Sequence, residues 1–251
     1  MSEEGSQRLD VELVRRGLAE SRSQARAAIE AGKVSVGGAI VTKVSAMVTA
    51  DTVIEAEKAH PWVSRGGIKL EHALNAFGRI FDVDPAGLFC LDIGASTGGF
   101  TEVLLSRGAR KVWAVDAGHS QLHPKLRADS RVVNLERTDA RSLTLAMLGE
   151  APQMIVCDVS FIGLAKALPA ALDIAASGSR LVGLFKPQFE VGPSHVGKGG
   201  IVSDLAAADR AAEAFGHWLV SKGWSVDGWS PSPIFGSDGN AERLFCSEKS
   251  R

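Results

Sequence analysis

The sequence predicts an α/β protein in which a doubly wound sheet follows a small α+β domain. Short apolar runs alternate with helical segments from about residue 88 onward, which is typical of parallel strands joined by crossover helices. A glycine-rich turn at 94–99 follows the first of these runs. Residues 8–57 show a different pattern of short helices and a glycine turn. We therefore expect a domain at 8–57, a connector at 58–66 and a larger domain at 67–251.

Composition and charge exclude several classes of protein. The 251 residues are 45% hydrophobic and 23% charged, as in an ordinary globular protein rather than a disordered one. No run approaches the ~18–20 apolar residues of a membrane span. The first ten residues are acidic and polar, unlike a secretory leader, so we expect a cytoplasmic protein without a membrane partner. The net charge of -1 means that any basic surface must be local.

The three cysteines do not indicate a metal site or a disulfide. Cys90, Cys157 and Cys246 each lie in a short apolar run, and no two form a CxxC pair. We expect buried strand thiols and no bound metal.

Two short helices and a hairpin are predicted in the N-terminal domain. Apolar residues between positions 9 and 18 form one helix face, and Gly17 is expected to end that helix. Ser21 and Gln24 have the spacing of a capping box at the start of a second helix, which Gly32 is expected to close. The run 33–36 alternates as a strand, and the glycines at 37–38 supply the turn to its partner at 40–43.

Basic residues outnumber acidic residues seven to four between positions 8 and 43, a local charge of +3. Arg22 and Arg26 are four residues apart, so both project from one helix face, where guanidinium groups can contact phosphates. A solvated helix face is the alternative. The candidate RNA contacts are Arg8, Arg15, Arg16, Arg22, Arg26, Lys33 and Lys43, together with Arg65 in the connector.

The runs RLD, GLAESRSQA and IEAGKVSVGG, followed by a lysine, resemble the S4 RNA-binding domain. The resemblance covers nearly all of this segment. It implies that the helix carrying Arg22 and Arg26, with the adjoining hairpin, faces structured RNA. Gly37 departs from the S4 pattern, which usually has Asn there.

Seven strands are expected in the larger domain, at 88–93, 111–115, 132–135, 154–157, 181–185, 224–229 and 244–246. A helix at 100–105 lies between the first two of them. In a doubly wound sheet the ligand crevice lies at the carboxyl ends of the strands. Residues directly after a strand are therefore candidates for the functional site.

The glycine-rich turn after the first strand favours S-adenosylmethionine over a dinucleotide. The dinucleotide fingerprint is not matched, because Ser96 stands at its second glycine. Asp92 would be a poor neighbour for a pyrophosphate, whereas the ammonium and sulfonium of S-adenosylmethionine are attracted to a carboxylate. Asp116 ends the next strand and can bind two ribose hydroxyls. Glycines that serve only as turns remain the alternative.

Four charged residues could carry out methyl transfer. A ribose 2′-hydroxyl is a weak acid, so its deprotonation requires a base such as a lysine whose pKa is lowered by burial and by a neighbouring cation. Lys69 begins a helix before the first strand, whereas Asp158 and Lys186 each follow a strand and Glu242 precedes the last one. Each residue alone is ordinarily a surface charge.

Together these residues resemble the lysine, aspartate, lysine, glutamate tetrad of FtsJ-like ribose 2′-O-methyltransferases. The runs SRGGIKLEHAL, LDIGASTGGFT, VDAGHSQLHPKLR, LERTDAR, CDVSFI, FKPQFEVG and SPIFGSDGNAE are similar to those of the TlyA, or hemolysin A-like, rRNA methyltransferases, over almost the whole chain. The resemblance implies a Rossmann-like methyltransferase domain with catalysis at Lys69, Asp158, Lys186 and Glu242. The candidate cofactor residues are Asp92, Gly94, Ser96, Thr97, Gly98, Gly99, Phe100, Asp116, Asp139 and Asp158, with Asp139 at the adenine and Asp158 near the methyl group.

The resemblance implies an S-adenosylmethionine-dependent enzyme that methylates a cytidine of 23S rRNA, with a 16S cytidine added in some members. The expected partner is ribosomal RNA within ribosomal subunits, and the sequence does not indicate an oligomeric state. In our hypothesis Lys186 is the base, Asp158 and Glu242 hold it, and Lys69 orients the nucleotide. The alternatives are a non-catalytic S4-containing assembly factor and a pore-forming hemolysin.

Overall fold

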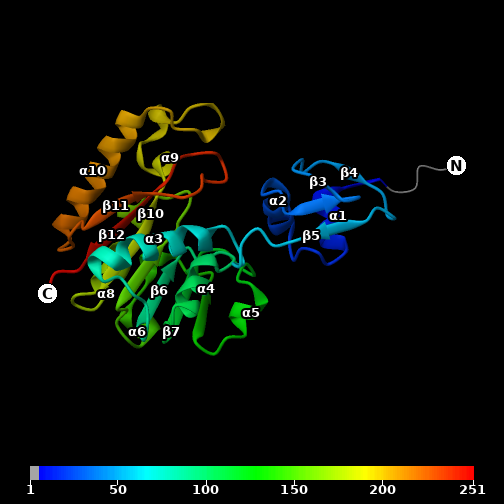
Figure 1. Cartoon of the computed structure of the whole chain (residues 1–251). Coiled ribbons are helices and arrows are strands. Elements are labelled where there is room, and N and C mark those ends of the chain that lie inside the picture. Colours follow the sequence, from blue (N-terminus) through cyan, green and yellow to red (C-terminus); the bar gives the residue numbers. More distant parts are fainter. Residues whose placement is uncertain (1–5) are drawn as a thin grey trace. The chain divides into compact units, whose positions relative to one another are not determined.

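The computed structural model describes residues 6–251, which form two compact units that divide after Ser64 (Figure 1). The division falls within the predicted connector at 58–66. Each unit has its own strands and its own buried core, so the two units are described separately.

Within residues 6–64, the smaller unit contains two helices and five short strands. In chain order they are β1 (Gln7–Arg8), α1 (Leu9–Arg15), α2 (Arg22–Glu30), β2 (Val34–Val36), β3 (Ala39–Ile40), β4 (Met47–Val48) and β5 (Ile54–Ala56). Strand β2 pairs antiparallel with β3 and with β5, and β1 pairs antiparallel with β4. The buried core consists of Leu9, Leu13, Ala25, Ala28, Ile29, Val34, Val48 and Ile54.

The capping box and the glycine turn of this unit are confirmed. Ser21 Oγ accepts a hydrogen bond from the Gln24 backbone N–H at 3.2 Å, and Gln24 Oε1 accepts one from the Glu20 N–H at 3.2 Å. These bonds satisfy backbone donors that a helix start leaves free. Gly37 and Gly38 have φ values of 58° and 83°, as the two central residues of a tight hairpin turn require.

The larger unit is built on one seven-stranded sheet in the order β11-β12-β10-β9-β6-β7-β8. The strands are β6 (Phe89–Ile93), β7 (Lys111–Asp116), β8 (Val132–Glu136), β9 (Met154–Cys157), β10 (Arg180–Phe185), β11 (Gly228–Pro231) and β12 (Arg243–Glu248). Strands β6 to β10 are parallel, whereas β12 is antiparallel to both β10 and β11. The reversal at β12 was not among the sequence predictions.

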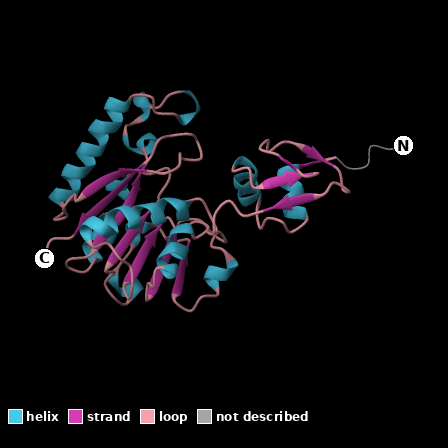
Figure 2. Cartoon of the chain, viewed as in Figure 1, coloured by secondary structure: helices cyan, strands magenta, loops and turns pink. Residues whose placement is uncertain are grey.

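Helices lie on both faces of this sheet (Figure 2). They are α3 (Gly66–Phe81), α4 (Gly99–Ser106), α5 (Pro124–Arg127), α6 (Leu145–Leu148), α7 (Leu164–Ala167), α8 (Pro169–Ile174), α9 (Pro187–Glu190) and α10 (Leu205–Ser221), with 3-10 turns η1 (Ala140–Ser142), η2 (Pro193–His195) and η3 (Lys198–Gly200). Helices α7, α8 and α10 share one core with the sheet, and α3 packs against α4. Among the described residues, no helix is long and apolar enough to span a membrane.

The sixth predicted strand, at 224–229, begins later than expected. Regular pairing starts at Gly228, and Trp224 forms only an isolated bridge to Lys249. The hydroxyl of Ser225 donates to Asp227 Oδ1 at 2.5 Å and accepts from the Glu248 N–H at 2.9 Å. Side-chain bonds of this kind compete with the regular ladder. The other six predicted strands are each found within two residues of their expected bounds.

The cysteine prediction is confirmed, because Cys90, Cys157 and Cys246 are all buried free thiols. Burial raises the pKa of Cys90 and of Cys246 to about 12. At neutral pH these thiols stay protonated and unreactive.

Candidate active site and cofactor pocket

A pocket of about 480 Å³ opens at the carboxyl ends of β6, β7 and β9. Strand β6 lies between β7 and β9, so the chain order reverses there and leaves a crevice above the sheet. Five predicted cofactor residues line the pocket, namely Gly94, Ser96, Asp116, Asp139 and Asp158. The other five, Asp92, Thr97, Gly98, Gly99 and Phe100, do not line it, although they belong to β6 and to the turn and helix that follow.

Two glycines of the turn are required for different reasons. Gly94 has φ 81°, and a Cβ at this position would lie 2.5 Å from the carbonyl oxygen of Asp158. Gly98 has φ 100°, and a Cβ there would overlap the side chain of Leu126. Gly94 thus lets the loops after β6 and β9 approach each other, whereas Gly98 permits packing against the segment that includes α5.

The turn fixes the carboxylate of Asp116 at the end of β7. Asp116 Oδ2 accepts a hydrogen bond from the Ser96 N–H at 2.8 Å, and Oδ1 accepts one from the Gly118 N–H at 2.7 Å. Ser96 has a positive φ of 47°, which turns its amide toward the carboxylate. Each oxygen keeps a second lone pair with which it can accept a ligand hydroxyl.

Asp92 is completely buried below the turn. Its Oδ2 accepts a hydrogen bond from the Thr101 hydroxyl at 2.6 Å, whereas its Oδ1 has no partner among residues 6–251. Burial raises the pKa of Asp92 to about 7, and the nearby Asp158 and Asp116 add to the rise. The carboxyl group is therefore sensitive to positive charge that arrives at the pocket.

Asp139 lies at the rim of the pocket and caps the short turn η1. Its Oδ1 accepts from the Arg141 N–H at 2.9 Å, and its Oδ2 accepts from the Arg141 guanidinium at 2.6 Å. The guanidinium of Arg141 lowers the pKa of Asp139 to about 2. The carboxylate is thus ionised and oriented at neutral pH.

The four predicted catalytic residues form two neighbouring ion pairs. Lys186 Nζ lies 2.6 Å from Asp158 Oδ1, and Lys69 Nζ forms a buried ion pair with Glu242 Oε2. Only 7% of Lys69, 9% of Lys186 and 4% of Glu242 is exposed. Burial raises the pKa of Glu242, while the charges of Lys69 and Lys186 oppose that rise and Asp158 adds to it. All four residues therefore lie within electrostatic range of one another.

The pairing differs from our hypothesis in one respect. We expected both Asp158 and Glu242 to hold Lys186, but Glu242 is bonded to Lys69 from α3. Lys186 Nζ instead donates to Ser160 Oγ at 2.9 Å. Sequence reasoning missed Ser160, although its position two residues after Asp158, at the end of a parallel strand, was a usable signal.

Four arginines of the smaller unit pair with two buried acids, which balance two of the four positive charges. Asp10 pairs with Arg8 and Arg22, at 2.9 and 2.8 Å. Glu12 pairs with Arg15 and Arg16, both at 2.6 Å. These guanidinium groups lower the pKa of Asp10 and of Glu12 to about 2. The pairs therefore stabilise the folded unit above about pH 4, and this contribution is lost as the pH falls toward 2.

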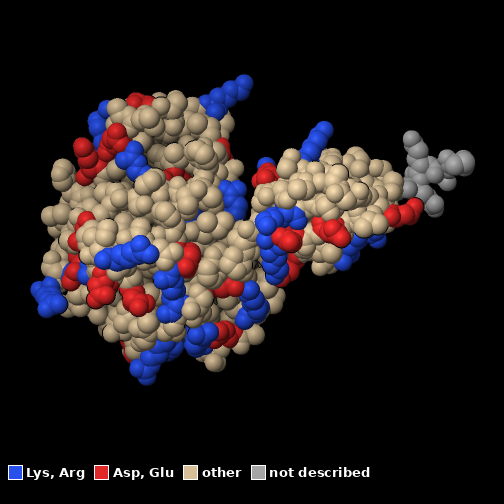
Figure 3. Space-filling model, viewed as in Figure 1, with Lys and Arg blue, Asp and Glu red and all other residues tan. Residues whose placement is uncertain are grey.

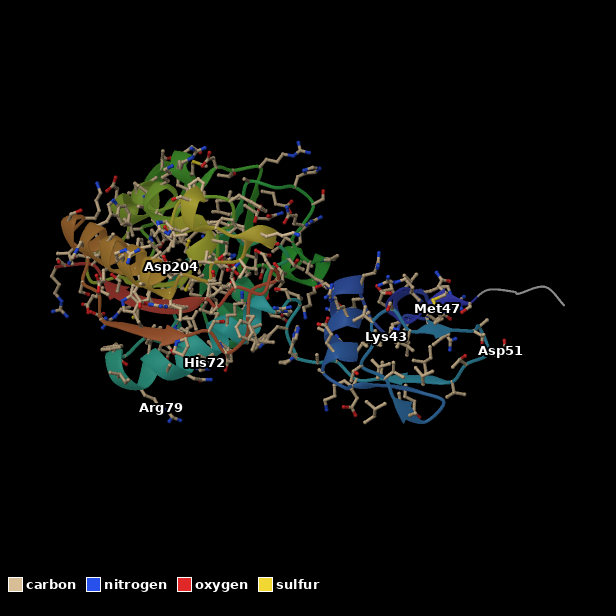
Figure 4. All side chains as sticks on the ribbon, turned by 90° about the horizontal axis from the view of Figure 1, so that it is seen from above. Lys43, Met47, Asp51, His72, Arg79 and Asp204 are labelled. Atoms are coloured by element: carbon tan, nitrogen blue, oxygen red, sulfur yellow. The ribbon has the colours of Figure 1, made fainter. Side chains whose placement is uncertain are left out.

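Three of the remaining candidate RNA contacts, Arg26, Lys33 and Arg65, have exposed partners or a backbone partner. Arg26 pairs with Glu30 at 2.7 Å and Lys33 with Glu57 at 3.1 Å. In the larger unit, the Arg65 guanidinium donates to the carbonyl oxygen of Phe235 at 2.5 Å. Basic and acidic side chains are interspersed over the visible face of the smaller unit (Figure 3), and Lys43 is labelled among its side chains in Figure 4.

Arg16 has a structural role that its charge does not reveal. Its guanidinium donates to the carbonyl oxygens of Thr49, Ala50 and Thr52, at 3.1, 2.8 and 2.6 Å, in addition to its pairing with Glu12. Only 22% of its side chain is exposed. Arg16 thus holds the turn between β4 and β5, whereas 67% of the Arg26 side chain is exposed.

The carboxylates in and beside the pocket fit S-adenosylmethionine. Asp116 and Asp158 line the pocket, and Asp92 lies just below with one unpartnered carboxyl oxygen. A ligand with an ammonium, a sulfonium and two ribose hydroxyls complements such carboxylates by charge and by hydrogen bonding.

The chain matches two known families. The FtsJ-like methyltransferase family matches residues 62–249, and the S4 domain matches residues 7–54. A structure from Listeria monocytogenes, assigned as an S-adenosylmethionine dependent methyltransferase, shares the fold, with a TM-score of 0.53 at 11% identity over 73% of this chain and 100% of that chain. The fold and these matches define an FtsJ-like methyltransferase with an N-terminal S4 domain.

Relatives that match nearly the full length of this chain identify the family within this class. The 16S/23S rRNA (cytidine-2'-O)-methyltransferase TlyA of Mycobacterium tuberculosis is 49% identical over 94% of this chain and 87% of its own length. Hemolysin A of Brachyspira hyodysenteriae is 40% identical over 94% and 98% of the two lengths. A solved Streptococcus thermophilus structure has a TM-score of 0.77 at 38% identity, covering 98% of this chain and 89% of that chain. The chain belongs to the TlyA family.

Proposed function

We propose that this protein transfers a methyl group from S-adenosylmethionine to the ribose 2′-hydroxyl of a cytidine in 23S rRNA, with 16S rRNA as a second substrate to test. The observation that carries the proposal is the juxtaposition of the Lys186–Asp158 and Lys69–Glu242 pairs beside the pocket. The name of the Mycobacterium tuberculosis relative supports the nucleotide and the position on the ribose. We place the reaction in the cytoplasm, where bacterial ribosomal subunits are made.

In this mechanism Lys186, as the neutral amine, accepts the proton of the 2′-hydroxyl. Asp158 holds Lys186 Nζ at 2.6 Å and also lines the pocket, so one carboxylate connects the base to the cofactor site. Lys69, held by Glu242, supplies a buried positive charge that orients the target nucleotide. Positioning of the reactants supplies much of the rate, on the order of 7–11 kcal/mol in ideal cases.

S-adenosylmethionine supplies a methyl group on a positively charged sulfur. With this group bound, the 2′-oxygen would form a bond to the methyl carbon, the carbon–sulfur bond would break with its electron pair on sulfur, and the hydroxyl proton would go to Lys186. We assign Asp116 to the ribose hydroxyls, Asp139 to the adenine and Asp158 to the methyl end. Asp92, through its charge, and the turn at 94–100 would support the methionine portion.

We assign RNA binding to residues 8–57 and catalysis to residues 67–251, joined by the connector at 58–66. The exposed outer sides of the paired arginines remain available to phosphates, because each guanidinium has five donors and the pairs use only some of them. Arg22, Arg26, Lys33 and Lys43 are the assigned phosphate contacts of this domain, with Arg8, Arg15 and Arg16 supporting them.

The test is a methyl-transfer assay with radiolabelled S-adenosylmethionine and unmodified 30S subunits, 50S subunits and free rRNAs. The wild type is compared with Lys186→Ala, and with Arg79→Ala as a control on the exposed side of α3, where Arg79 is labelled in Figure 4. We expect label on RNA that is lost in Lys186→Ala, by at least about 100-fold, and retained in Arg79→Ala. Cofactor binding, followed by calorimetry, should survive in both variants.

The labelled subunit identifies the substrate, and nuclease mapping of the product identifies the nucleotide. Label on a base rather than on a ribose would contradict the assigned reaction. Cofactor binding without label on any RNA would favour a non-catalytic S4-containing assembly factor. Turnover retained in Lys186→Ala would contradict the assignment of the base.

A further inference from the structure

We infer that Ser160 is a positioning residue that directs the amine of Lys186 toward the substrate hydroxyl, an inference that rests on the proposed function. Ser160 follows β9 and lines the cofactor pocket, and it is exposed at the rim. Its Oγ accepts a hydrogen bond from Lys186 Nζ at 2.9 Å. The serine hydroxyl thus touches the catalytic amine at the place where a substrate would enter.

The argument depends on the geometry of an amine. A lysine nitrogen has four tetrahedral directions, one of which is taken by Cε. Ser160 Oγ occupies a second direction, because it accepts the hydrogen bond that Lys186 Nζ donates at 2.9 Å. Asp158 Oδ1 lies 2.6 Å from Nζ as the ion-pair partner but without hydrogen-bond geometry. When Lys186 is neutral, the bond to Ser160 therefore holds one N–H group and keeps the lone pair to the remaining directions. The proton of the 2′-hydroxyl can be received only along the lone pair.

Asp158 alone would leave the direction of the lone pair undefined, because its ion pair with Lys186 lacks hydrogen-bond geometry. Without a hydrogen bond, the amine can rotate about its Cε–Nζ bond and place its lone pair in several orientations. The hydrogen bond to Ser160 restricts that rotation, in the way that supporting hydrogen bonds fix a catalytic group. Glu242 does not supply this hydrogen bond, because it bonds to Lys69.

Ser160 is itself held in place by the segment that follows Lys186. The ring of Phe161, whose φ is 66°, lies 5.4 Å from the ring of Phe189. Glu190 Oε1 accepts from the Leu164 N–H at 2.9 Å. The segment 158–164 after β9 is therefore attached to the segment 186–190 after β10 at two points that follow Ser160.

The charged and titratable groups around Lys186 come from several elements. Asp158 and Cys157 belong to β9 and its end, Glu242 precedes β12, and Lys69 belongs to α3. None of these groups changes in a Ser160 variant. A shift in the pH dependence of turnover in such a variant therefore reports the removed hydroxyl.

The experiment compares Ser160→Ala with Ser160→Thr, which keeps the hydroxyl. Ser177→Ala is the matched control, since this exposed serine lies just before β10, at the opposite end of that strand from Lys186. Turnover on the labelled RNA is measured from about pH 6 to about pH 9, and cofactor affinity is measured separately by calorimetry. Circular dichroism checks that each variant folds.

In Ser160→Ala we expect the plateau value of kcat to fall about tenfold, because the lone pair is no longer directed. The rising part of the plot of kcat against pH should move to lower pH. A hydrogen-bond acceptor favours the charged amine, so removal of the Ser160 hydroxyl favours the neutral amine. Cofactor affinity should change by less than about twofold. Ser160→Thr should restore both the plateau and the rising part, and Ser177→Ala should match the wild type.

Three results would overturn the inference while wild-type turnover stands. They are a wild-type pH profile in Ser160→Ala, an equal loss in Ser160→Thr, and a loss explained entirely by weaker cofactor binding. A wild type that labels no RNA would instead refute the proposed function itself, so the two failures are distinguishable.

Discussion

One group of ion pairs in each unit shows a different pattern of burial. In the smaller unit the acids Asp10 and Glu12 are buried, whereas the side chains of Arg8, Arg15 and Arg22 are about half exposed or more and that of Arg16 is 22% exposed. In the larger unit both partners of the Lys69–Glu242 pair are buried. A charge that is buried on both sides is costly to desolvate, and its retention indicates a purpose other than stability. The comparison therefore distinguishes pairs whose cations lie mostly at the surface from a pair with two buried charges, for which we propose a catalytic role.

The largest effect should follow from breaking the buried pair of the larger unit. Lys69→Ala leaves Glu242 buried without its cation, so we expect a loss of about 3 kcal/mol in the free energy of unfolding together with loss of methyl transfer. Urea denaturation followed by tryptophan fluorescence measures the first, and the labelling assay measures the second.

The double variant Lys69→Met/Glu242→Leu sharpens this test. Apolar residues of similar size should recover stability without recovering activity. If Lys69→Ala were as stable as the wild type, the pair would contribute nothing to the fold. The contrast with the smaller unit would then be lost.

A smaller effect should separate two arginines of the smaller unit. Arg16→Ala removes bonds to three backbone carbonyls and to Glu12, so we expect a loss of about 2 kcal/mol in stability. Hydrogen exchange of the amides in β4 and β5 measures this loss of stability. Arg26→Ala breaks an exposed pair and should change stability by no more than about 0.5 kcal/mol.

For RNA affinity, unlike for stability, Arg26→Ala should have a measurable effect. Arg26→Ala should weaken RNA binding without unfolding the domain. It should also reduce the slope of log K against log salt concentration by about one, the value for one lost phosphate contact. Titrations at several salt concentrations test this expectation. An unchanged salt slope in Arg26→Ala would mean that this helix face is merely solvated.

The last expected effect concerns the pH dependence of cofactor binding. The pKa of Asp92 is raised to about 7, and a cationic ligand near Asp158 and Asp116 favours its ionised form. Affinity for S-adenosylmethionine should therefore rise about tenfold from about pH 6 to about pH 8, because binding releases a proton. Calorimetry in buffers of different ionisation enthalpy measures both quantities. In Asp92→Asn the affinity should be flat over this range, and a persistent rise would assign the proton to another group.

Local patterns were sufficient to predict much of the fold. The capping box at Ser21 and the turn at Gly37 depend on residues a few positions apart, so sequence spacing determines them. The same holds for the parallel strands β6, β7, β9 and β10, whose apolar runs mark burial on both faces. The irregular start of β11 depends on Ser225 bonding across to β12, which no local pattern reveals.

The candidate site was predicted as a set of residues but not as a set of bonds. Asp158 and Lys186 each follow a parallel strand, so their approach could be expected from the topology. Lys69 and Glu242 are 173 positions apart, and their pairing depends on the packing of α3 beside β12. Likewise, the charge count of the smaller unit could not show that Asp10 and Glu12 are buried and Arg16 is structural, because burial is set by the tertiary fold.

The buried cysteines give this protein a practical advantage for spectroscopy. All three thiols are inaccessible, and the raised pKa values of Cys90 and Cys246 leave almost no thiolate to react with a maleimide at neutral pH. A single cysteine introduced at an exposed position such as Met47 or Arg79 can therefore carry a fluorophore without removal of the native thiols. With one such cysteine and dye on each unit, the distance between the two dyes could be followed while RNA and cofactor are added.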